Sequence, residues 1–298
     1  MIDFSEMGQK LGFVGTGVMG ASMAENLMNA GHELHIFNRT KSKADRLISN
    51  GAHWCSSPGE VASNSEVTFA IVGFPEDVES VFLGKDGLIE KSEAGKVIID
   101  MTTSSPALAI KIAKEGRARD ISAMDAPVSG GDIGAREAKL SIMVGGDKKT
   151  FDKCLPLFQI MGKNIVYQGP AGSGQHTKMC NQIAIASTMV AICESLIYAH
   201  KSGLDPKNVL KSIESGAAGS WSLSNLGPRI LNNDFEPGFF IKHIVKDITI
   251  ARDSARELGL NLPGLDLALK SYSKLEEMGL GEKGTQALFN LYKQEAGL

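Results

Sequence analysis

Cysteine is scarce in this sequence, and its placement argues against a disulfide framework and against a metal site. The 298 residues include four cysteines whose spacing is typical of neither, and no histidine–carboxylate or cysteine cluster indicates a metal ligand set. Residues 1–10, MIDFSEMGQK, lack the charged-then-apolar pattern of a signal peptide. We therefore expect no metal and a reducing, cytoplasmic location. The cysteines are Cys55, Cys154, Cys180 and Cys193.

An excess of either charge is also missing. The net charge is −3 and no basic stripe is visible, so we expect no nucleic-acid partner. One long apolar run follows Asn181, but Ser187, Thr188 and Glu194 leave it short of the ~20 clean apolar residues that span a membrane. We expect this run to form a buried core helix and expect no membrane partner. The composition, 43% hydrophobic and 22% charged, is typical of a globular protein.

The hydrophobic pattern changes near residues 169–174, GPAGSG. Before this point, short apolar runs alternate with helical patterns, as in a parallel α/β sheet. After it, strand signals stop and long helical patterns follow. We predict two domains, residues 1–173 and 174–298, joined by a long helix that begins near Gln175. The expected strands are KLGFVG, ELHIFN, EVTFAIVG, KVIIDM, ISAMDAPV, LSIMVGG and NIVYQG; the expected helices are 18–30, 41–49, 106–116, 148–161, 175–201, 205–215, 241–258 and 263–277.

A glycine-rich turn follows the first predicted strand. Gly15, Gly17 and Gly20 form a G-x-G-x-x-G pattern that opens a helix. The first glycine permits the tight turn, the second lets the backbone approach a pyrophosphate, and the third lets helix and strand pack closely. The pattern alone is weak, but its position between a strand and a helix favours a dinucleotide site over a purely structural loop. We therefore expect an N-terminal Rossmann-type doubly wound sheet, with Thr16, Val18 and Met19 also near the cofactor.

The end of the second predicted strand distinguishes the two nicotinamide dinucleotides. NAD-binding proteins usually carry Asp or Glu there, which binds the ribose 2′-hydroxyl. This chain has Asn38, Arg39 and Thr40. Asn38 removes the repulsion that a carboxylate would exert on a 2′-phosphate, and the planar guanidinium of Arg39 suits that phosphate. Although Arg39 could simply be a solvated residue at a helix start, the charges favour NADP over NAD.

Three loops are expected at the carboxyl ends of the strands, where open α/β sheets bind ligands. In VGFPEDV, Gly73, Phe74 and Pro75 could line the cofactor. DMTTSSP offers the hydroxyls of Thr102, Thr103 and Ser104. In DAPVSGG, Ser129, Gly130 and Gly131 carry little side chain, so their backbone N–H groups could surround a small anion. An ordinary turn would explain the two glycines as well, and the residues alone leave that choice open.

A charge and two amides stand at the start of the apolar run. Lys178, Asn181 and Gln182 lie on one face of the expected helix, because residues three and four apart are neighbours. A lysine near a helix N-terminus is disfavoured by about 0.3–1 kcal/mol, which argues for a reason to keep it. A lysine with its ammonium at the surface is the simpler alternative. His176 is a lesser candidate for a base, since it lies on a different face.

Together these motifs resemble the β-hydroxyacid dehydrogenase family over essentially the whole chain. GFVGTGVMGASMAENLMNAGH is similar to the cofactor motif of that family, and DAPVSGG to its substrate-anchoring motif. GSGQHTKMCNQ is similar to the catalytic motif, and FFIKHIVKDITIA to a late motif near cofactor and substrate. Four motifs in order are more specific than the glycine pattern alone.

The resemblance implies roles for individual residues. Lys178 would be the catalytic residue and Asn181 would help to hold substrate and lysine. Ser129, Gly130 and Gly131 would anchor a substrate carboxylate, and Thr103 would lie near substrate or nicotinamide.

Lys246 would approach the cofactor, with Asp247 beside it in the active-site network, and Phe239 would form a wall of the pocket. The chain departs from the family at Gln182, where many members have asparagine, and at Thr102, where serine is commoner; the amide and the hydroxyl are retained.

The implied reaction is the reduction of an aldehyde or ketone, or its reverse. The nicotinamide supplies the hydride, and the ammonium of Lys178 can stabilise the developing alkoxide and give it a proton. In the oxidation direction a neutral lysine would act as base, so burial would have to lower its pKa from roughly 10.4.

The sequence leaves the substrate open. NRT at residues 38–40 is similar to the NADPH-using glyoxylate and succinic semialdehyde reductases, while tartronate semialdehyde and methylmalonate semialdehyde also combine a carbonyl with a carboxylate. The pocket walls are expected near Trp221, Phe239 and Phe240. The apolar helical half favours a homodimer or homotetramer. The alternatives are an NAD-linked 3-hydroxyisobutyrate dehydrogenase, a tartronate semialdehyde reductase and, less favoured, a non-catalytic NADP-binding module. A decarboxylating sugar-phosphate dehydrogenase is disfavoured, since the substrate loops lack extra basic residues.

Overall fold

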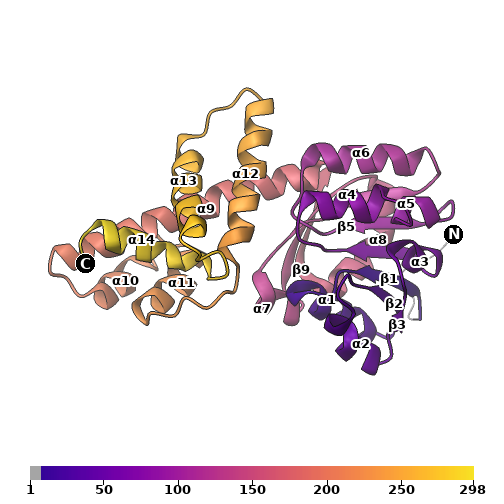
Figure 1. Cartoon of the computed structure of the whole chain (residues 1–298), viewed down its shortest axis with the longest axis horizontal. Helices are drawn as coiled ribbons and strands as arrows, with labels where there is room; N and C mark the ends of the chain where they lie inside the picture. The colour runs from indigo at the N-terminus through magenta and orange to yellow at the C-terminus, as the bar shows by residue number, and fades with distance from the viewer. Residues whose placement is uncertain (1–7) are drawn as a thin grey trace. The chain divides into compact units, whose positions relative to one another are not determined.

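The first half of the chain forms one mixed, mainly parallel sheet (Figure 1). The computed structural model describes residues 8–298, so the N-terminal segment considered above for a signal peptide lies largely outside the described residues. The strand order is β3-β2-β1-β4-β5-β6-β8-β7, with β9 paired to β8. The strands are β1 (Lys10–Val14), β2 (Glu33–Phe37), β3 (His53–Trp54), β4 (Val67–Ala70), β5 (Val97–Asp100), β6 (Ser122–Asp125), β7 (Val128–Ser129), β8 (Leu140–Gly145) and β9 (Gly162–Gly169).

The parallel part of this sheet has the doubly wound order that the sequence predicts. β3, β2, β1, β4, β5 and β6 are all mutually parallel, which is the Rossmann arrangement. Val14, Ala70, Asp100 and Asp125 are in register across four of these strands. Because parallel strands end at the same edge, the loops that follow these four residues open together at one edge of the sheet.

Helices cover both faces of the sheet, which explains the nearly continuous apolar runs in its strands. In β1, Phe13 packs in the core with α1, α2 and α8, whereas the next residue, Val14, packs in the core with α3 to α6. Figure 1 shows these two helical layers. The helices are α1 (Val18–Asn29), η1 (Lys41–Ala44), α2 (Asp45–Ser49), α3 (Pro58–Ser63), α4 (Pro75–Leu83), α5 (Leu88–Lys91), α6 (Pro106–Arg117), α7 (Gly131–Arg136) and α8 (Lys148–Met161).

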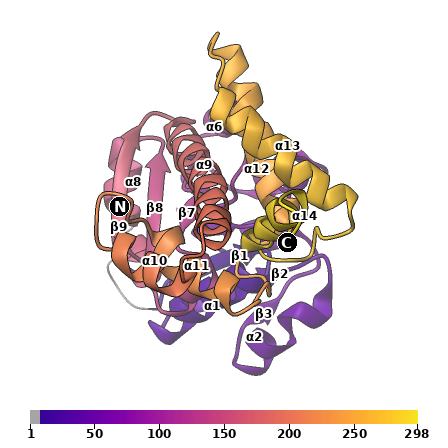
Figure 2. The ribbon, with the colours of Figure 1, turned by 90° about the vertical axis from the view of Figure 1, so that its left-hand side faces the viewer.

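The second half is helical apart from loops, as predicted, and has a core of its own. Met189, Cys193 and Leu196 of α9 pack there with Tyr272 and Leu288. α10 lies beside α11, and α12 beside α13, in both views of the ribbon (Figure 2). The elements are α9 (Ser173–Lys201), α10 (Pro206–Ile213), α11 (Trp221–Leu231), α12 (Ile241–Glu257), α13 (Pro263–Glu277), η2 (Thr285–Ala287) and α14 (Leu288–Glu295).

The chain divides into two compact units, residues 1–178 and 179–298. The division predicted from the sequence, at residue 173/174, is at the start of α9, whereas the two compact units meet inside that helix. α9 is long and apolar enough to cross a membrane by length and composition alone, a test that core helices also pass, and 39% of its most apolar window is buried. Its contacts in the core of the helical unit favour the core-helix interpretation.

Two local predictions are wrong in detail. The helix expected over 41–49 begins as the 3₁₀ helix η1, a common conformation at helix N-termini. The strand expected over ISAMDAPV is interrupted at Ala126 and Pro127, because a proline has no N–H to give to the ladder.

Candidate active site

The glycine-rich turn joins β1 to α1 and leaves open space where a ligand could approach the backbone of the turn. Gly15 has a φ of +95°, and a Cβ on Gly20 would lie 1.9 Å from the carbonyl oxygen of Gly15, so both glycines are required by the protein itself. A Cβ on Gly17, in contrast, would meet nothing within 4 Å, and its φ is an ordinary −73°. Packing therefore gives no reason for Gly17, whereas close approach of a pyrophosphate does.

The loop after β2 is tied to the glycine-rich turn. The side-chain oxygen of Asn38 accepts a hydrogen bond of 2.9 Å from the N–H of Thr16, and its amide nitrogen donates to the carbonyl of Thr40 at 2.8 Å. Asn38 thus fixes the loop, while the Arg39 side chain is 85% exposed and lies 2.9 Å from the carboxylate of Asp77. An aspartate at 38 could not make both bonds, because it has no donor for the carbonyl of Thr40.

The loop after β4 leads into α4. Val72 donates its N–H to the hydroxyl of Thr102, 3.0 Å away, which connects this loop to the one after β5. Phe74 is the N-terminal flanking residue of α4 and is 39% exposed; Gly73 precedes it. Asp77 accepts a hydrogen bond from the N–H of Phe74 at 3.2 Å. The predicted cofactor residues Gly73 and Phe74 therefore lie at the same sheet edge as the glycine-rich turn.

A buried carboxylate anchors the first turn of α9 to β6. Asp125 accepts hydrogen bonds from the N–H groups of Gly172, at 2.7 Å, and Gln175, at 2.8 Å. A negative charge at a helix N-terminus interacts favourably with the helix dipole. Burial raises the pKa of Asp125, and the backbone N–H donors oppose that rise. The bonds hold the start of α9 against the carboxyl end of β6.

Gln175 fastens the same helical turn to the loop after β5. Its side-chain oxygen accepts from the N–H of Ser104 at 2.9 Å, and its amide nitrogen donates to the carbonyl of Thr102 at 2.7 Å. The residue is fully buried. Sequence reasoning missed this role, although Gln175 lies three residues before Lys178 and therefore on the same helical face. Thr103, which these two bonds flank, is half-buried.

The SGG segment begins α7 at the end of a short antiparallel strand. Ser129 pairs with Ser141 of β8, and Gly130 and Gly131 have φ values of +134° and +64°. A Cβ on Gly131 would meet nothing within 4 Å, so the surroundings leave room there. Ser129 and Gly131 are half-buried and Gly130 is exposed. These residues follow the loop from β6, the strand that anchors α9.

Lys178 is 6% exposed, so the alternative of a surface lysine does not hold. It lies one helical turn after Gln175, and it belongs to the compact unit that contains the sheet. His176, the lesser candidate for a base, is exposed. Lys178 thus follows a helical turn that is bound to the loop after β5, which carries Thr103, and to the carboxyl end of β6.

The helical unit contains a polar chain that links α9 to α12. The amide nitrogen of Asn181 donates to the side-chain oxygen of Gln182 at 2.7 Å, and Gln182 donates in turn to Asp247 at 2.5 Å. The other carboxylate oxygen of Asp247 lies 2.9 Å from the ammonium nitrogen of Lys246, and both side chains are nearly buried. Although many family members have asparagine at position 182, the glutamine of this chain donates a hydrogen bond to Asp247.

The aromatic residues predicted as pocket walls have different surroundings. Phe239 is half-buried against the helical core, with its ring 6.4 Å from that of His243. Phe240 precedes α12 and lies edge-on to the same histidine at 5.7 Å. Trp221 is 65% exposed at the start of α11. Burial lowers the pKa of His243, and the positive charges of Lys246 and Lys242 lower it further.

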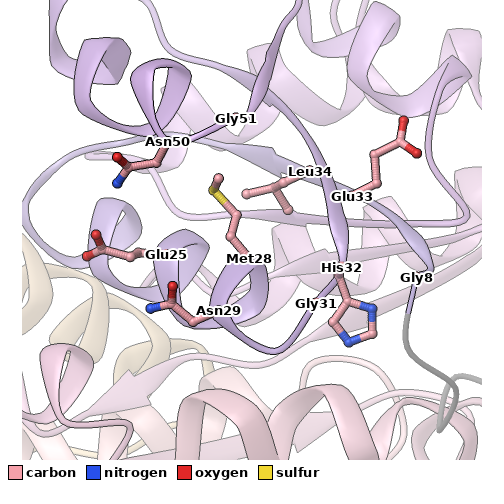
Figure 3. Close-up of a pocket in the computed structure, with 10 residues that line it drawn as sticks. All are labelled: Gly8, Glu25, Met28, Asn29, Gly31, His32, Glu33, Leu34, Asn50 and Gly51. Atoms are coloured by element: carbon pink, nitrogen blue, oxygen red, sulfur yellow. The ribbon is translucent and has the colours of Figure 1, made fainter.

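A pocket of about 630 Å³ opens at the other edge of the sheet (Figure 3). Its lining includes Gly8, Gly31 and His32, which come just before β1 and β2, so it lies at the amino ends of these strands. It is therefore separate from the loops described above. Among residues 8–298, no group of three or more histidine, cysteine or acidic side chains is placed to hold a metal ion.

The residues around the glycine-rich turn fit a nicotinamide dinucleotide. No side chain caps the N-terminus of α1, the space beside Gly17 is open, and the Thr16 hydroxyl is buried without a hydrogen-bond partner in the described part of the chain. Free N–H groups at a helix N-terminus bind phosphate. Arg39 and Thr40 follow the neighbouring strand, where the adenosine ribose lies in such sites.

Known proteins share both halves of this chain. Residues 10–169 match the NAD-binding domain of 6-phosphogluconate dehydrogenase, and residues 172–292 match the NAD-binding domain of NADP-dependent 3-hydroxyisobutyrate dehydrogenase. A probable 3-hydroxyisobutyrate dehydrogenase-like protein of Arabidopsis thaliana is 50% identical over 94% of this chain and 84% of its own length. The 2-hydroxy-3-oxopropionate reductase of Escherichia coli is 42% identical over 85% of this chain and 87% of its own.

A solved structure agrees with these matches. The 3-hydroxyisobutyrate dehydrogenase of Mycobacterium tuberculosis, with L-serine, superposes with a TM-score of 0.88 at 28% identity, over 96% of this chain and 99% of that one. The fold and these relatives define a nicotinamide-dependent oxidoreductase. The chain belongs to the β-hydroxyacid dehydrogenase family, as its four motifs predict.

Proposed function

We propose that this protein is an NADP-dependent reductase of small aldehydes that carry a carboxylate, with glyoxylate and succinic semialdehyde as the preferred class of substrate and Lys178 as general acid. The observation that carries the proposal is the double attachment of the helical turn that precedes Lys178. Gln175 ties this turn to the loop after β5, and Asp125 ties it to β6. Lys178 follows on the next turn of α9, and we infer that it acts beside the loops that carry Thr103 and the SGG segment.

The proposed chemistry divides between cofactor and protein. When bound, the nicotinamide supplies the hydride that forms the new C–H bond at the carbonyl carbon. Lys178 gives its proton to the carbonyl oxygen, which becomes the hydroxyl, and its positive charge stabilises that oxygen as negative charge develops. Asn181 lies one helical turn further along α9, and we assign it to holding substrate and lysine. In the reverse direction the neutral amine of Lys178 takes the hydroxyl proton.

The proposed carboxylate site is the SGG segment. Ser129, Gly130 and Gly131 combine a hydroxyl with backbone N–H groups next to open space at Gly131. Successive N–H groups at a turn bind small anions well. Thr103, from the next loop, completes the proposed polar contacts of substrate and nicotinamide. In the helical unit we assign Lys246 to the cofactor, Asp247 to the network that holds Lys246 and Gln182, and Phe239 to the wall of the substrate pocket.

The proposed preference for NADP rests on Asn38, Arg39 and Thr40. Asn38 uses both ends of its amide within the protein, so no carboxylate opposes a 2′-phosphate at this position. The exposed guanidinium of Arg39 can bind that phosphate through two N–H groups, and Thr40 adds a hydroxyl.

The test is an NADPH oxidation assay with glyoxylate, succinic semialdehyde, tartronate semialdehyde and methylmalonate semialdehyde, repeated with NADH. Wild-type protein should favour NADPH and reduce glyoxylate or succinic semialdehyde best, and Arg39→Ala should lower the NADPH/NADH ratio of kcat/KM. An unchanged ratio in Arg39→Ala would contradict the NADP assignment. A strong preference for NADH with methylmalonate semialdehyde would instead indicate an NAD-linked 3-hydroxyisobutyrate dehydrogenase.

We further propose that the protein acts in the cytoplasm as a homodimer or homotetramer. Cys180, Ala184, Ala191 and Tyr198 of α9 are exposed in the single chain, and covering them with a second copy would remove apolar surface from water. Sedimentation equilibrium of the purified protein should give a multiple of 31.7 kDa. A monomer at micromolar concentration would contradict this assembly.

A further inference from the structure

A carboxylate from α4 contacts the residue proposed to select the cofactor. Nη1 of Arg39 donates to Oδ1 of Asp77 at 2.9 Å, although the two residues lie 38 positions apart. The other oxygen, Oδ2, accepts from the N–H of Phe74 at 3.2 Å. A Cβ on Gly73 would come within 3.1 Å of that oxygen, so glycine there leaves room for the carboxylate. Asp77 is therefore fixed at the start of α4.

The side chains of Asp77 and Arg39 differ in how far they are held by the rest of the protein. The side chain of Asp77 is 27% exposed and is held by the α4 backbone, whereas that of Arg39 is 85% exposed. Within residues 8–298, the side chain of Arg39 makes one hydrogen bond, which is the bond to Asp77. The contact uses one of the five N–H groups of the guanidinium and leaves the edge formed by Nε and Nη2 for a second anion. A phosphate binds to such an edge through two parallel hydrogen bonds.

We propose that Asp77 is a positioning residue for cofactor selection: it holds Arg39 with its free edge directed at the 2′-phosphate of the dinucleotide. Ordering a long side chain before the ligand arrives lowers the entropy that binding would otherwise cost. The loop is fixed on its other side by Asn38, which bonds to Thr16 and Thr40. Asp77 therefore acts through Arg39 and does not touch the cofactor. This inference rests on the proposed use of NADP.

The experiment measures equilibrium binding of NADPH and NADH without substrate, by fluorescence titration, to wild type, Asp77→Asn, Arg39→Ala and the double variant. Asn keeps the size of Asp77 and an oxygen for the N–H of Phe74 but loses the charge. We expect Asp77→Asn to raise the Kd for NADPH about two- to fivefold, the range for an exposed ion pair, and to leave the Kd for NADH unchanged. The double variant should bind NADPH no more weakly than Arg39→Ala alone.

Glu76→Gln is the matched control, because it removes the same charge from the neighbouring position, where Glu76 is exposed. Its Kd for NADPH should not rise. The proposal is overturned if Asp77→Asn leaves NADPH binding unchanged or tightens it, if it weakens NADPH and NADH equally, or if Glu76→Gln has the same effect. Arg39→Ala separates the proposed use of NADP from the proposed role of Asp77. If Arg39→Ala weakens NADPH binding but Asp77→Asn does not, only the role of Asp77 is contradicted. Unchanged binding in Arg39→Ala contradicts the NADP assignment and the role of Asp77 with it.

Discussion

The buried carboxylate of Asp125 accepts a hydrogen bond of 2.8 Å from the backbone N–H of Gln175, fifty residues further along the chain. The Gln175 side chain then bonds to the loop after β5, so one helical turn is held by two strands of the sheet at once. Lys178 is on the following turn. The position of the proposed proton donor thus depends on two residues that do not themselves react.

Replacing Gln175 by Met keeps the length of the side chain and removes both of its hydrogen bonds. The N–H of Ser104 and the carbonyl of Thr102 would be left buried and unpaired. Each unpaired group should lower the free energy of unfolding by about 1–3 kcal/mol. A displacement of Lys178 by about 1 Å would lower kcat roughly 100-fold. Steady-state kinetics and urea unfolding measure the two effects. His176→Ala, an exposed neighbour, should change neither, and a Gln175→Met enzyme with normal kcat would show that the attachment is dispensable.

Lys178→Ala should lose nearly all turnover and still bind NADPH. General acid catalysis contributes about 10²–10⁴ in rate, so kcat should fall by at least about 100-fold. The glycine-rich turn and Arg39 are unaffected by the change, so the Kd for NADPH should stay within about twofold of wild type, less than one ordinary hydrogen bond contributes. Single-turnover kinetics separate chemistry from product release. Near-normal turnover would remove Lys178 from the mechanism.

Lys246→Ala should raise the KM for cofactor or substrate and lower stability. Its ammonium is 2.9 Å from the buried carboxylate of Asp247, and breaking a buried pair costs about 3–5 kcal/mol. The double variant Lys246→Ala, Asp247→Asn removes the unpaired charge and should recover much of that stability. If Lys246 serves only as the partner of Asp247, KM will also recover in the double variant; a KM that stays high supports contact with a ligand.

Gln182→Leu should weaken the link between α9 and α12. Its amide nitrogen bonds to Asp247, and its oxygen accepts from Asn181. Losing the bond to a buried carboxylate costs about 1–3 kcal/mol. Gln182→Asn, the residue common in the family, keeps the amide on a shorter side chain and should lie between wild type and Gln182→Leu. Equal melting temperatures for all three would show that this hydrogen bond is not important for stability.

His243 should make the folded protein less stable in mild acid. Burial lowers its pKa below the ordinary value of 6.5, so the unfolded chain binds a proton at a pH where the folded protein does not. The contribution of His243 to stability is therefore lost as the pH falls from 6.5 toward the lowered pKa. The neighbouring charges act in both directions: Lys246 and Lys242 lower the pKa, while Asp247 and Glu282 raise it. His243→Gln should reduce the pH dependence of the melting temperature in this range, and an unchanged slope would contradict the assignment.

The sequence predicts the fold well where the pattern is long or repeated. The strands β1, β4 and β5 are nearly continuous apolar runs because both of their faces are buried, and α9 is a long apolar helix, so each is visible in the sequence. The two-residue strand β3 and the six-residue helix α7 escape prediction, because so few residues show no periodicity.

The candidate site is predictable only in part, for a related reason. The glycine-rich turn, SGG and Lys178 belong to local motifs, and neighbouring residues give them their meaning. The bonds from Gln182 to Asp247 and from Arg39 to Asp77 join positions 65 and 38 residues apart, and the sequence pattern carries no sign of such pairs. Gln175 lies between these cases, because its place in the catalytic motif is visible but its two partners are not.

The most direct test of the proposed reaction and of the role of Lys178 is the rate of NADPH oxidation with glyoxylate and succinic semialdehyde, compared with acetaldehyde and butanal, which lack the carboxylate. Wild type should reduce the two carboxylate-bearing aldehydes with far higher kcat/KM than their neutral counterparts, and Lys178→Ala should reduce none of them although it binds NADPH. Equal rates with charged and neutral aldehydes, or turnover that persists in Lys178→Ala, would contradict the proposal.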